Sequence, residues 1–149
     1  MKNLILNFSK FILALMGLSL VACRVEYGSP HAEFRAMGVV TDEEGQPING
    51  IRVVMSAEDP NNNIKGPSDT LWTGAYGTYD YEPDYYSMRE YAYFESVKFQ
   101  FTDVDGPANG GEFAQVEIEV PVFQVEPGDG NWYRGSFQSG VDVTMFKKQ

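Results

Sequence analysis

Cysteine, histidine and basic residues are all scarce in this sequence of 149 residues. One cysteine and one histidine allow no internal disulfide and no histidine-rich metal site. The 21 Asp and Glu residues outnumber the 11 Lys and Arg residues, which gives a formal net charge of −10. This balance argues against sequence-independent binding to nucleic acid, because such binding needs clustered Lys and Arg side chains that contact the phosphates. A hydrophobic content of 43% and an aromatic content of 14% still indicate one domain with a packed core.

The first 23 residues carry an export signal. A basic leader precedes an apolar run at 11–22, which fits a secretory signal peptide. The run is too short for a membrane-spanning helix, which needs about 20 residues. It ends in Leu-Val-Ala-Cys at 20–23, which resembles the lipobox of bacterial lipoproteins. The resemblance implies removal of residues 1–22 and a lipid anchor on Cys23 in the bacterial cell envelope, on the exported side. An ordinary signal peptide or an uncleaved anchor is the alternative.

Cleavage before Cys23 would change the chemistry of the chain. It removes two of the 11 basic residues and no acidic one, so the net charge moves from −10 to −12. No free thiol would remain, which excludes thiol chemistry. Residues 23–33 are short and polar, with Gly28 and Pro30 as breakers, and we expect a lipidated tether there. Within it, His31 beside Glu33 is interpreted as a solvated residue.

The rest of the chain, 34–149, has the pattern of an all-β domain. Val97, Phe99 and Phe101 alternate with polar residues, and 116–120 and 141–145 repeat that alternation. We expect a seven-stranded β-sandwich of the transthyretin-like or immunoglobulin-like kind, with one or two helical turns at 85–95. The expected strands are 34–40, 51–57, 69–74, 78–81, 97–103, 116–120 and 141–145.

One segment of this pattern resembles a known family. Residues 38–53 combine a strand, an acidic Gly turn, a Pro, a Gly and a second strand, and 69–79 end in Gly-Thr-Tyr. Both elements resemble carboxypeptidase regulatory-like domains. The resemblance covers about 34–82 and implies a transthyretin-like sandwich with no catalytic residues of its own.

A second resemblance covers nearly the whole chain. The cysteine of the lipobox, the segment at 27–34, the paired strands around the Gly turn and the segment at 101–113 occur together. This combination is similar to small lipoproteins encoded beside radical SAM proteins. The resemblance implies a radical SAM protein as a partner and no assigned activity.

An acidic loop is the strongest candidate for a metal site. Its side chains offer hard oxygen ligands of the kind that Ca²⁺ prefers, and the candidate ligands are Asp103, Asp105, Asn109 and Glu112. The spacing departs from the EF-hand pattern, and the same residue types are common in long turns. We expect a structural turn, with a calcium site as the alternative and no other cofactor.

Tyrosines gather in the middle of the sequence. They predict either a sugar- or peptide-binding face or part of the core, and we favour the core. The members that would bind a ligand are Tyr76, Tyr85, Tyr86 and Tyr93. The glutamates at 117, 119 and 126 are interpreted as a solvated face.

These features predict a non-enzymatic, membrane-anchored envelope lipoprotein that acts as a binding or scaffolding module. A partner or substrate role toward a radical SAM protein fits that prediction. The main alternative is a surface adhesion module that depends on carbohydrate or calcium. A hydrolase that uses Asp103 and Asp105 has less support, because the sequence carries no recognisable nucleophile motif.

Overall fold

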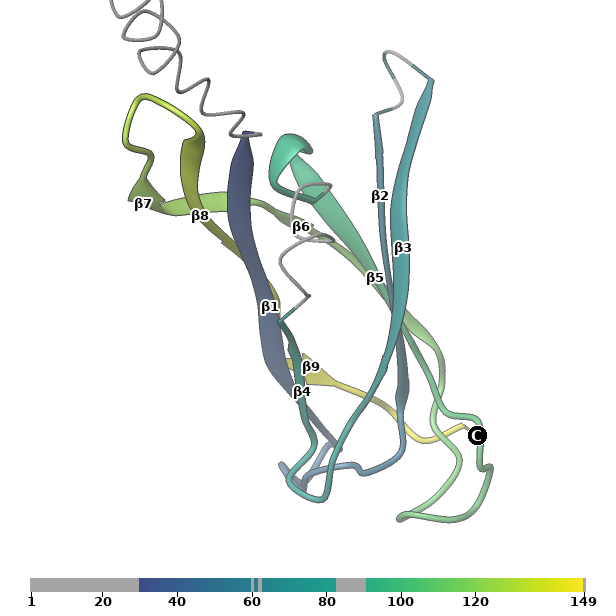
Figure 1. Ribbon diagram of the computed structural model, residues 1–149. Helices are drawn as coiled ribbons and strands as arrows, with labels where there is room; N and C mark the ends of the chain where they lie inside the picture. The colour runs from purple at the N-terminus through teal and green to yellow at the C-terminus, as the bar shows by residue number, and fades with distance from the viewer. Residues whose placement is uncertain (1–29, 60, 62, 83–90, 149) are drawn as a thin grey trace, which may run out of the picture.

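The computed structural model describes residues 30–59, 61, 63–82 and 91–148, and in these residues the regular structure is almost entirely β (Figure 1). One short 3-10 helix, η1, is the exception. The elements, in chain order, are β1 His31–Thr41, β2 Arg52–Asp59, β3 Ile64–Trp72, β4 Thr78–Tyr81, η1 Tyr91–Tyr93, β5 Ser96–Thr102, β6 Val116–Pro121, β7 Phe123–Pro127, β8 Tyr133–Ser139 and β9 Val143–Thr144.

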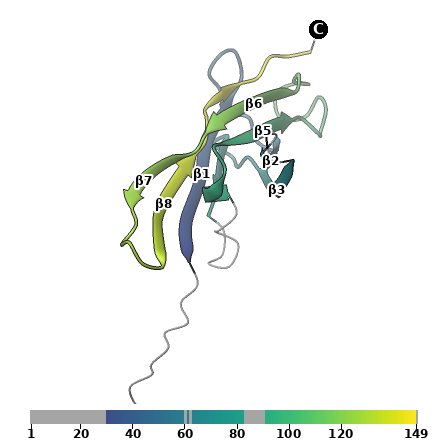
Figure 2. The ribbon, with the colours of Figure 1, turned by 90° about the horizontal axis from the view of Figure 1, so that it is seen from above.

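The strands form two sheets that face each other. One sheet has the order β4-β1-β8-β7, and β9 pairs with the C-terminal end of β1. The other sheet has the order β3-β2-β5-β6. Figure 2 shows β1, β8 and β7 on one side of the molecule and β2, β3, β5 and β6 on the other. β1 pairs with β8 and β9 in parallel, and the other strand pairs are antiparallel. The prediction of an all-β sandwich is confirmed, with nine strands in the described residues rather than seven.

The alternating segments supply the core between the sheets. The nine side chains expected to share one core do so, because five are buried and four pack against them. The buried five are Val97, Phe99, Phe101, Val143 and Met145, and the partly buried four are Val116, Ile118, Val120 and Val141. Tyr79 and Tyr91 are buried as well, so these two members of the tyrosine-rich stretch belong to the core.

The turn between β1 and β2 follows from its sequence. Asp42 accepts hydrogen bonds from the backbone N–H groups of Glu44 and Gln46 at 3.0 and 2.7 Å. Gly45 takes a φ of 76°, a left-handed conformation that suits glycine. Aspartate and glycine therefore act here as the turn residues that the pattern predicts.

Strands β7 and β8 and the start of β1 differ from the expectation. All five residues of β7 are exposed, so β7 shows no alternation between buried and solvent-facing positions. β8 contains a bulge that breaks its period of two. β1 begins at His31, so the last three residues of the expected tether belong to the sheet. Of the expected helical turns at 85–95, the structure describes only the part from Tyr91 onward, which contains η1.

Candidate functional site

A row of three polar side chains crosses the solvent-facing side of the first sheet. In the strand register, Glu33 of β1 and Glu126 of β7 both lie opposite Ser136 of β8. The Oγ atom of Ser136 is 3.1 Å from Oε2 of Glu33 and 3.2 Å from Oε2 of Glu126. A serine hydroxyl has one proton to donate and two lone pairs to accept with. Ser136 can therefore donate to one glutamate at a time and accept a proton from the other.

Two β-bulges place this row on one face. The register between β1 and β8 shifts between residues 31 and 33 of β1, and the register between β7 and β8 shifts between residues 124 and 126 of β7. Gly135 lies at the bulge of β8 with a φ of 109°, and a Cβ atom there would lie 2.3 Å from the carbonyl oxygen of Glu126. Only glycine fits this position, and a bulge of this kind re-aims the side chains beside it.

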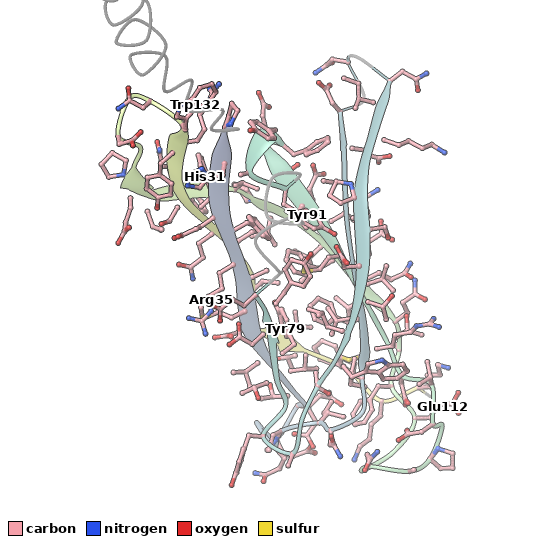
Figure 3. The ribbon with its side chains drawn as sticks, in the orientation of Figure 1. His31, Arg35, Tyr79, Tyr91, Glu112 and Trp132 are labelled. Atoms are coloured by element: carbon pink, nitrogen blue, oxygen red, sulfur yellow. The ribbon has the colours of Figure 1, made fainter. Side chains whose placement is uncertain are left out.

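Tyr133 and His31 extend the row toward the start of β1. The hydroxyl of Tyr133 is 2.9 Å from Oγ of Ser136 and donates to Oε2 of Glu33 at 3.4 Å. The rings of His31 and Tyr133 have centroids 5.3 Å apart and are tilted by 40°. His31 is half-buried in the sheet, which differs from the solvated tether residue that the sequence predicts. The single histidine, which Figure 3 labels, thus lies against Tyr133 beside the polar row.

A shallow hollow of about 340 Å³ adjoins the row. Its lining includes Glu33 and Ser136 together with Arg35, Glu82 and Val125.

One wall of the hollow carries a fixed ion pair. Arg35 of β1 makes two hydrogen bonds to Asp80 of β4, at 3.0 and 2.6 Å. The hydrogen bond from Arg35 lowers the pKa of the Asp80 carboxyl. A small polar molecule in the hollow would therefore meet Glu33, Glu82, the Ser136 hydroxyl and the Arg35 guanidinium, whose charge Asp80 balances.

Sequence reasoning missed this site for an identifiable reason. The sequence places Glu33 in the expected tether and Glu126 on the expected solvated face. Glu126 does face solvent, but it also contacts Ser136. One available signal was Gly135, because an isolated glycine inside a strand suggests a bulge.

The expected calcium ligands occupy the loop between β5 and β6, and protein donors already engage them. Asp103 accepts from the backbone N–H groups of Asp105 and Phe113 at 3.2 and 2.9 Å. Asp105 accepts from the side-chain amide of Asn109, and Glu112 pairs with Lys148 at 2.6 Å. Among the described residues, no group of three or more His, Cys, Asp or Glu side chains is placed to hold a metal ion. A calcium site here stays a prediction.

The expected tyrosine face is divided between the two ends of the sandwich. Tyr76 is 80% exposed in the turn between β3 and β4, and Tyr93 is 57% exposed in η1, at the other end of the molecule (Figure 1). Tyr93 lines a separate cleft of about 490 Å³ with Glu58, Glu95 and Glu119. Tyr85 and Tyr86 lie outside the described residues. The structure does not bring Tyr76 and Tyr93 to one surface.

A second polar cluster lies between the sheets. The hydroxyls of Tyr81 and Tyr91 each donate to Oδ2 of Asp69 at 2.9 Å. Burial and the hydrogen bond with Asp69 raise the pKa of Tyr91 well above its usual range. Because Asp69 belongs to β3 and Tyr81 to β4, the cluster joins the two sheets. Its position in the interior gives it a structural role.

The anchor prediction falls largely outside the described residues, which do not include Cys23. Within the part of the chain that the structure covers, no helix is both long and apolar enough to cross a lipid bilayer.

Comparison with known proteins gives a likeness in fold. No family model matches the chain, and no curated protein matches it either. Catechol 1,2-dioxygenase from Pseudomonas arvilla C-1 is similar with a TM-score of 0.51 at 11% identity, over 83% of this chain and 55% of that enzyme. Catechol 1,2-dioxygenase from Acinetobacter sp. ADP1 gives 0.49 at 12% identity, over 85% of this chain and 55% of that one. Hydroxyquinol 1,2-dioxygenase from Pseudomonas putida DLL-E4 gives a TM-score of 0.48 at 8% identity, over 85% of this chain and 64% of that enzyme.

These comparisons correct one expectation. The chain covers less than two thirds of each of these enzymes, and the likeness at this identity concerns the fold alone. Even so, the catechol 1,2-dioxygenase from Pseudomonas arvilla C-1 is an enzyme, which contradicts the prediction of a non-enzymatic binding, scaffolding or adhesion module. The prediction rested on the lack of a recognisable nucleophile motif together with the sandwich pattern, the acidic exterior and the tyrosine-rich middle, and none of these features excludes catalysis.

Proposed function

We propose that this chain is an exported, lipid-anchored enzyme that cleaves a hydroxyl-rich substrate with a carboxylic acid and a carboxylate nucleophile at the Glu33–Ser136–Glu126 row. The single observation that carries the proposal is the register of three neighbouring strands. Two glutamates lie opposite one serine, on a face built with two bulges and an obligatory glycine. Bulges are frequent beside active sites, because they re-aim side chains at some cost to regular pairing.

The chemistry needs a proton donor and a nucleophile on either side of a glycosidic bond. Each glutamate has an oxygen within 3.2 Å of the same Oγ, so those two oxygens lie no more than about 6 Å apart, which is nearer to the spacing of retaining than of inverting glycoside hydrolases. Glu126 as a carboxylic acid would protonate the leaving oxygen. Glu33 as a carboxylate would attack the sugar carbon and form a glycosyl ester as the leaving group departs. Water, deprotonated by Glu126, would then hydrolyse that ester and restore both carboxyl groups.

The hydrogen bonds distinguish the two roles. Glu33 accepts from two hydroxyls, those of Ser136 and Tyr133, which favours the ionised carboxylate that a nucleophile needs. Glu126 contacts Ser136 alone among the hydroxyls of the row, which suits the group that gives up its proton. The net charge of −12 expected after cleavage disfavours anionic substrates, so a neutral sugar derivative fits best.

The test is a set of hydrolysis assays on the purified full chain with neutral aryl and alkyl glycosides. Glu33→Gln and Glu126→Gln should each lower kcat by about 10²–10⁴-fold on alkyl glycosides. Aryl glycosides with acidic leaving groups need less protonation, so Glu126→Gln should retain more activity on them than Glu33→Gln does.

Glu117→Gln is the matched control, because Glu117 faces solvent on β6 in the opposite sheet. Equal loss of activity in the control, or no turnover by the wild-type chain on any substrate, would overturn the proposal.

The location and partner are proposed on separate grounds. The lipobox supports a lipid anchor at Cys23 in the bacterial cell envelope, and labelled fatty acid should enter the wild-type chain and not Cys23→Ala. The resemblance to lipoproteins encoded beside radical SAM proteins supports such a protein as a partner. Co-purification with the product of a neighbouring radical SAM gene tests that partner.

A further inference from the structure

We propose that the end of the sandwich that carries Trp132 rests on a lipid surface, with the Trp132 side chain at the membrane–water interface. The inference rests on the lipidation of Cys23 in the proposed function and not on the chemistry of the Glu33–Ser136–Glu126 row. Trp132 is 46% exposed in the turn between β7 and β8. We call this end of the molecule the Trp132 end.

The chain enters the fold beside this tryptophan. The backbone N–H of His31, the first residue of β1, donates to the carbonyl oxygen of Trp132 at 2.8 Å. Figure 3 shows Trp132 at the end of the molecule where β1 starts. An anchor at Cys23 therefore attaches to the Trp132 end of the sandwich.

The length of the tether restricts which end can reach the lipid. Residues 24–30 number seven, and seven residues span at most about 25 Å when fully extended. β1 has 11 residues and runs roughly 33 Å from the Trp132 end to the opposite end. If the opposite end touched the membrane, Pro30 would lie farther from the surface than the tether can span. Of the two ends, the Trp132 end is thus the one that the tether allows to rest on the bilayer.

The side chains at this end suit a zwitterionic interface. Tryptophan and tyrosine combine an apolar ring with a polar tip, which favours the headgroup region. Figure 1 shows the start of β3 and η1 at the end of the molecule where β1 starts. Exposed Ile64 begins β3, and exposed Tyr93 belongs to η1. Glu58 and Glu95 also lie there, which disfavours anionic lipid.

A fixed turn presents Trp132. Asp129 accepts from the backbone N–H groups of Asn131 and Tyr133 at 2.8 and 3.3 Å. The residues on both sides of Trp132 are therefore held in place.

The chain contains its own control. Its second tryptophan, Trp72, is 54% exposed, and it ends β3 at the opposite end of the sandwich. Trp72→Phe leaves Trp132 as the only tryptophan, and Trp132→Phe leaves Trp72. The two variants report the two ends of one fold with the same chemical probe.

The experiment uses the lipidated full chain in phosphatidylcholine vesicles whose acyl chains carry bromine close to the headgroup. Bromine quenches tryptophan fluorescence at contact range. We expect the fluorescence of Trp132 to be quenched and shifted to shorter wavelength relative to detergent solution. We expect the fluorescence of Trp72 to keep its intensity and wavelength.

Cys23→Ala in the Trp72→Phe background should lose the quenching, because the tether then no longer holds the domain at the vesicle. Equal quenching of the two tryptophans, quenching of Trp72 alone or quenching of neither would overturn the inference. None of these outcomes bears on the glycoside assays, so the two proposals fail separately.

Discussion

The hydroxyl of Tyr79 makes two hydrogen bonds to one residue, Val141. It donates to the carbonyl oxygen of Val141 at 2.8 Å and accepts from its N–H at 2.9 Å. Tyr79 belongs to β4 and Val141 precedes β9, so the pair ties the C-terminal segment to the first sheet. Gly38 of β1 lies against both partners, and a Cβ atom there would lie 2.2 Å from the Val141 carbonyl. The buried Tyr79 side chain thus pairs with the backbone N–H and C=O of Val141 as a neighbouring strand would.

Removal of this hydroxyl tests the importance of the pair. Tyr79→Phe should lower the free energy of unfolding by about 1–3 kcal/mol, because it leaves the N–H and C=O of Val141 unpaired. Urea unfolding measures the change. Tyr76→Phe is the control, since Tyr76 is highly exposed and its substitution should cost less than about 0.5 kcal/mol. Equal stability of the two variants would contradict the role of the pair.

The same hydroxyl predicts how stability depends on pH. Burial raises the pKa of Tyr79 to about 12, above its usual value of about 10. The folded state therefore keeps the proton after the unfolded chain has lost it, and stability falls as pH rises from about 10 to about 12. Unfolding free energies across this interval should fall less steeply in Tyr79→Phe than in the wild type. Parallel curves for the two proteins would contradict the prediction.

The shared core can be tested with one buried and one exposed position on paired strands. Phe99 is fully buried, and its ring lies 6.0 Å from that of Tyr79 and 6.3 Å from that of Phe101. Phe99→Ala should lower the free energy of unfolding by about 3–5 kcal/mol through lost burial and a cavity. Glu117→Ala on the solvent side of β6 should change it by less than about 0.5 kcal/mol. Similar melting temperatures for the two variants would refute the assignment of faces.

Calcium should leave the stability of the chain unchanged. Both oxygens of Asp103 accept backbone N–H groups, and the Glu112 carboxylate pairs with Lys148. A cation would have to replace these donors. A ligand at 100 times its Kd adds about 2.7 kcal/mol, which would raise Tm by several degrees. Thermal unfolding with millimolar Ca²⁺ and with a chelator measures this shift. A rise that disappears in Asp105→Ala would show that the loop binds calcium.

The fold could be predicted largely because its core strands alternate. Val97, Phe99 and Phe101 lie on one face at a period of two, and burial follows that period. The turn at Asp42 and Gly45 was predicted equally well, because its hydrogen bonds are local. β7 could not be predicted, because all its residues are exposed and its sequence has no buried face to reveal.

The candidate site could not be predicted, because it depends on pairing between distant strands. Glu33 and Ser136 are 103 residues apart and meet through the parallel pairing of β1 with β8. Periodicity indicates that strands exist, and it does not say which of them become neighbours. Register also matters, since the bulges change which residues share a face.

The bulge at Gly135 leads to the last prediction, which connects the backbone to the site. Gly135→Ala should destabilise the fold by about 1–3 kcal/mol, because alanine is strained at a φ of 109° and its Cβ would lie 2.3 Å from the Glu126 carbonyl oxygen. The backbone shift that relieves this contact should also separate Glu126 from Ser136 and lower activity. Gly74→Ala is the matched control, because its nearest neighbour would be 3.9 Å away. Urea unfolding and glycoside hydrolysis measure the two effects. If both variants keep wild-type stability and activity, the bulge does not support the site.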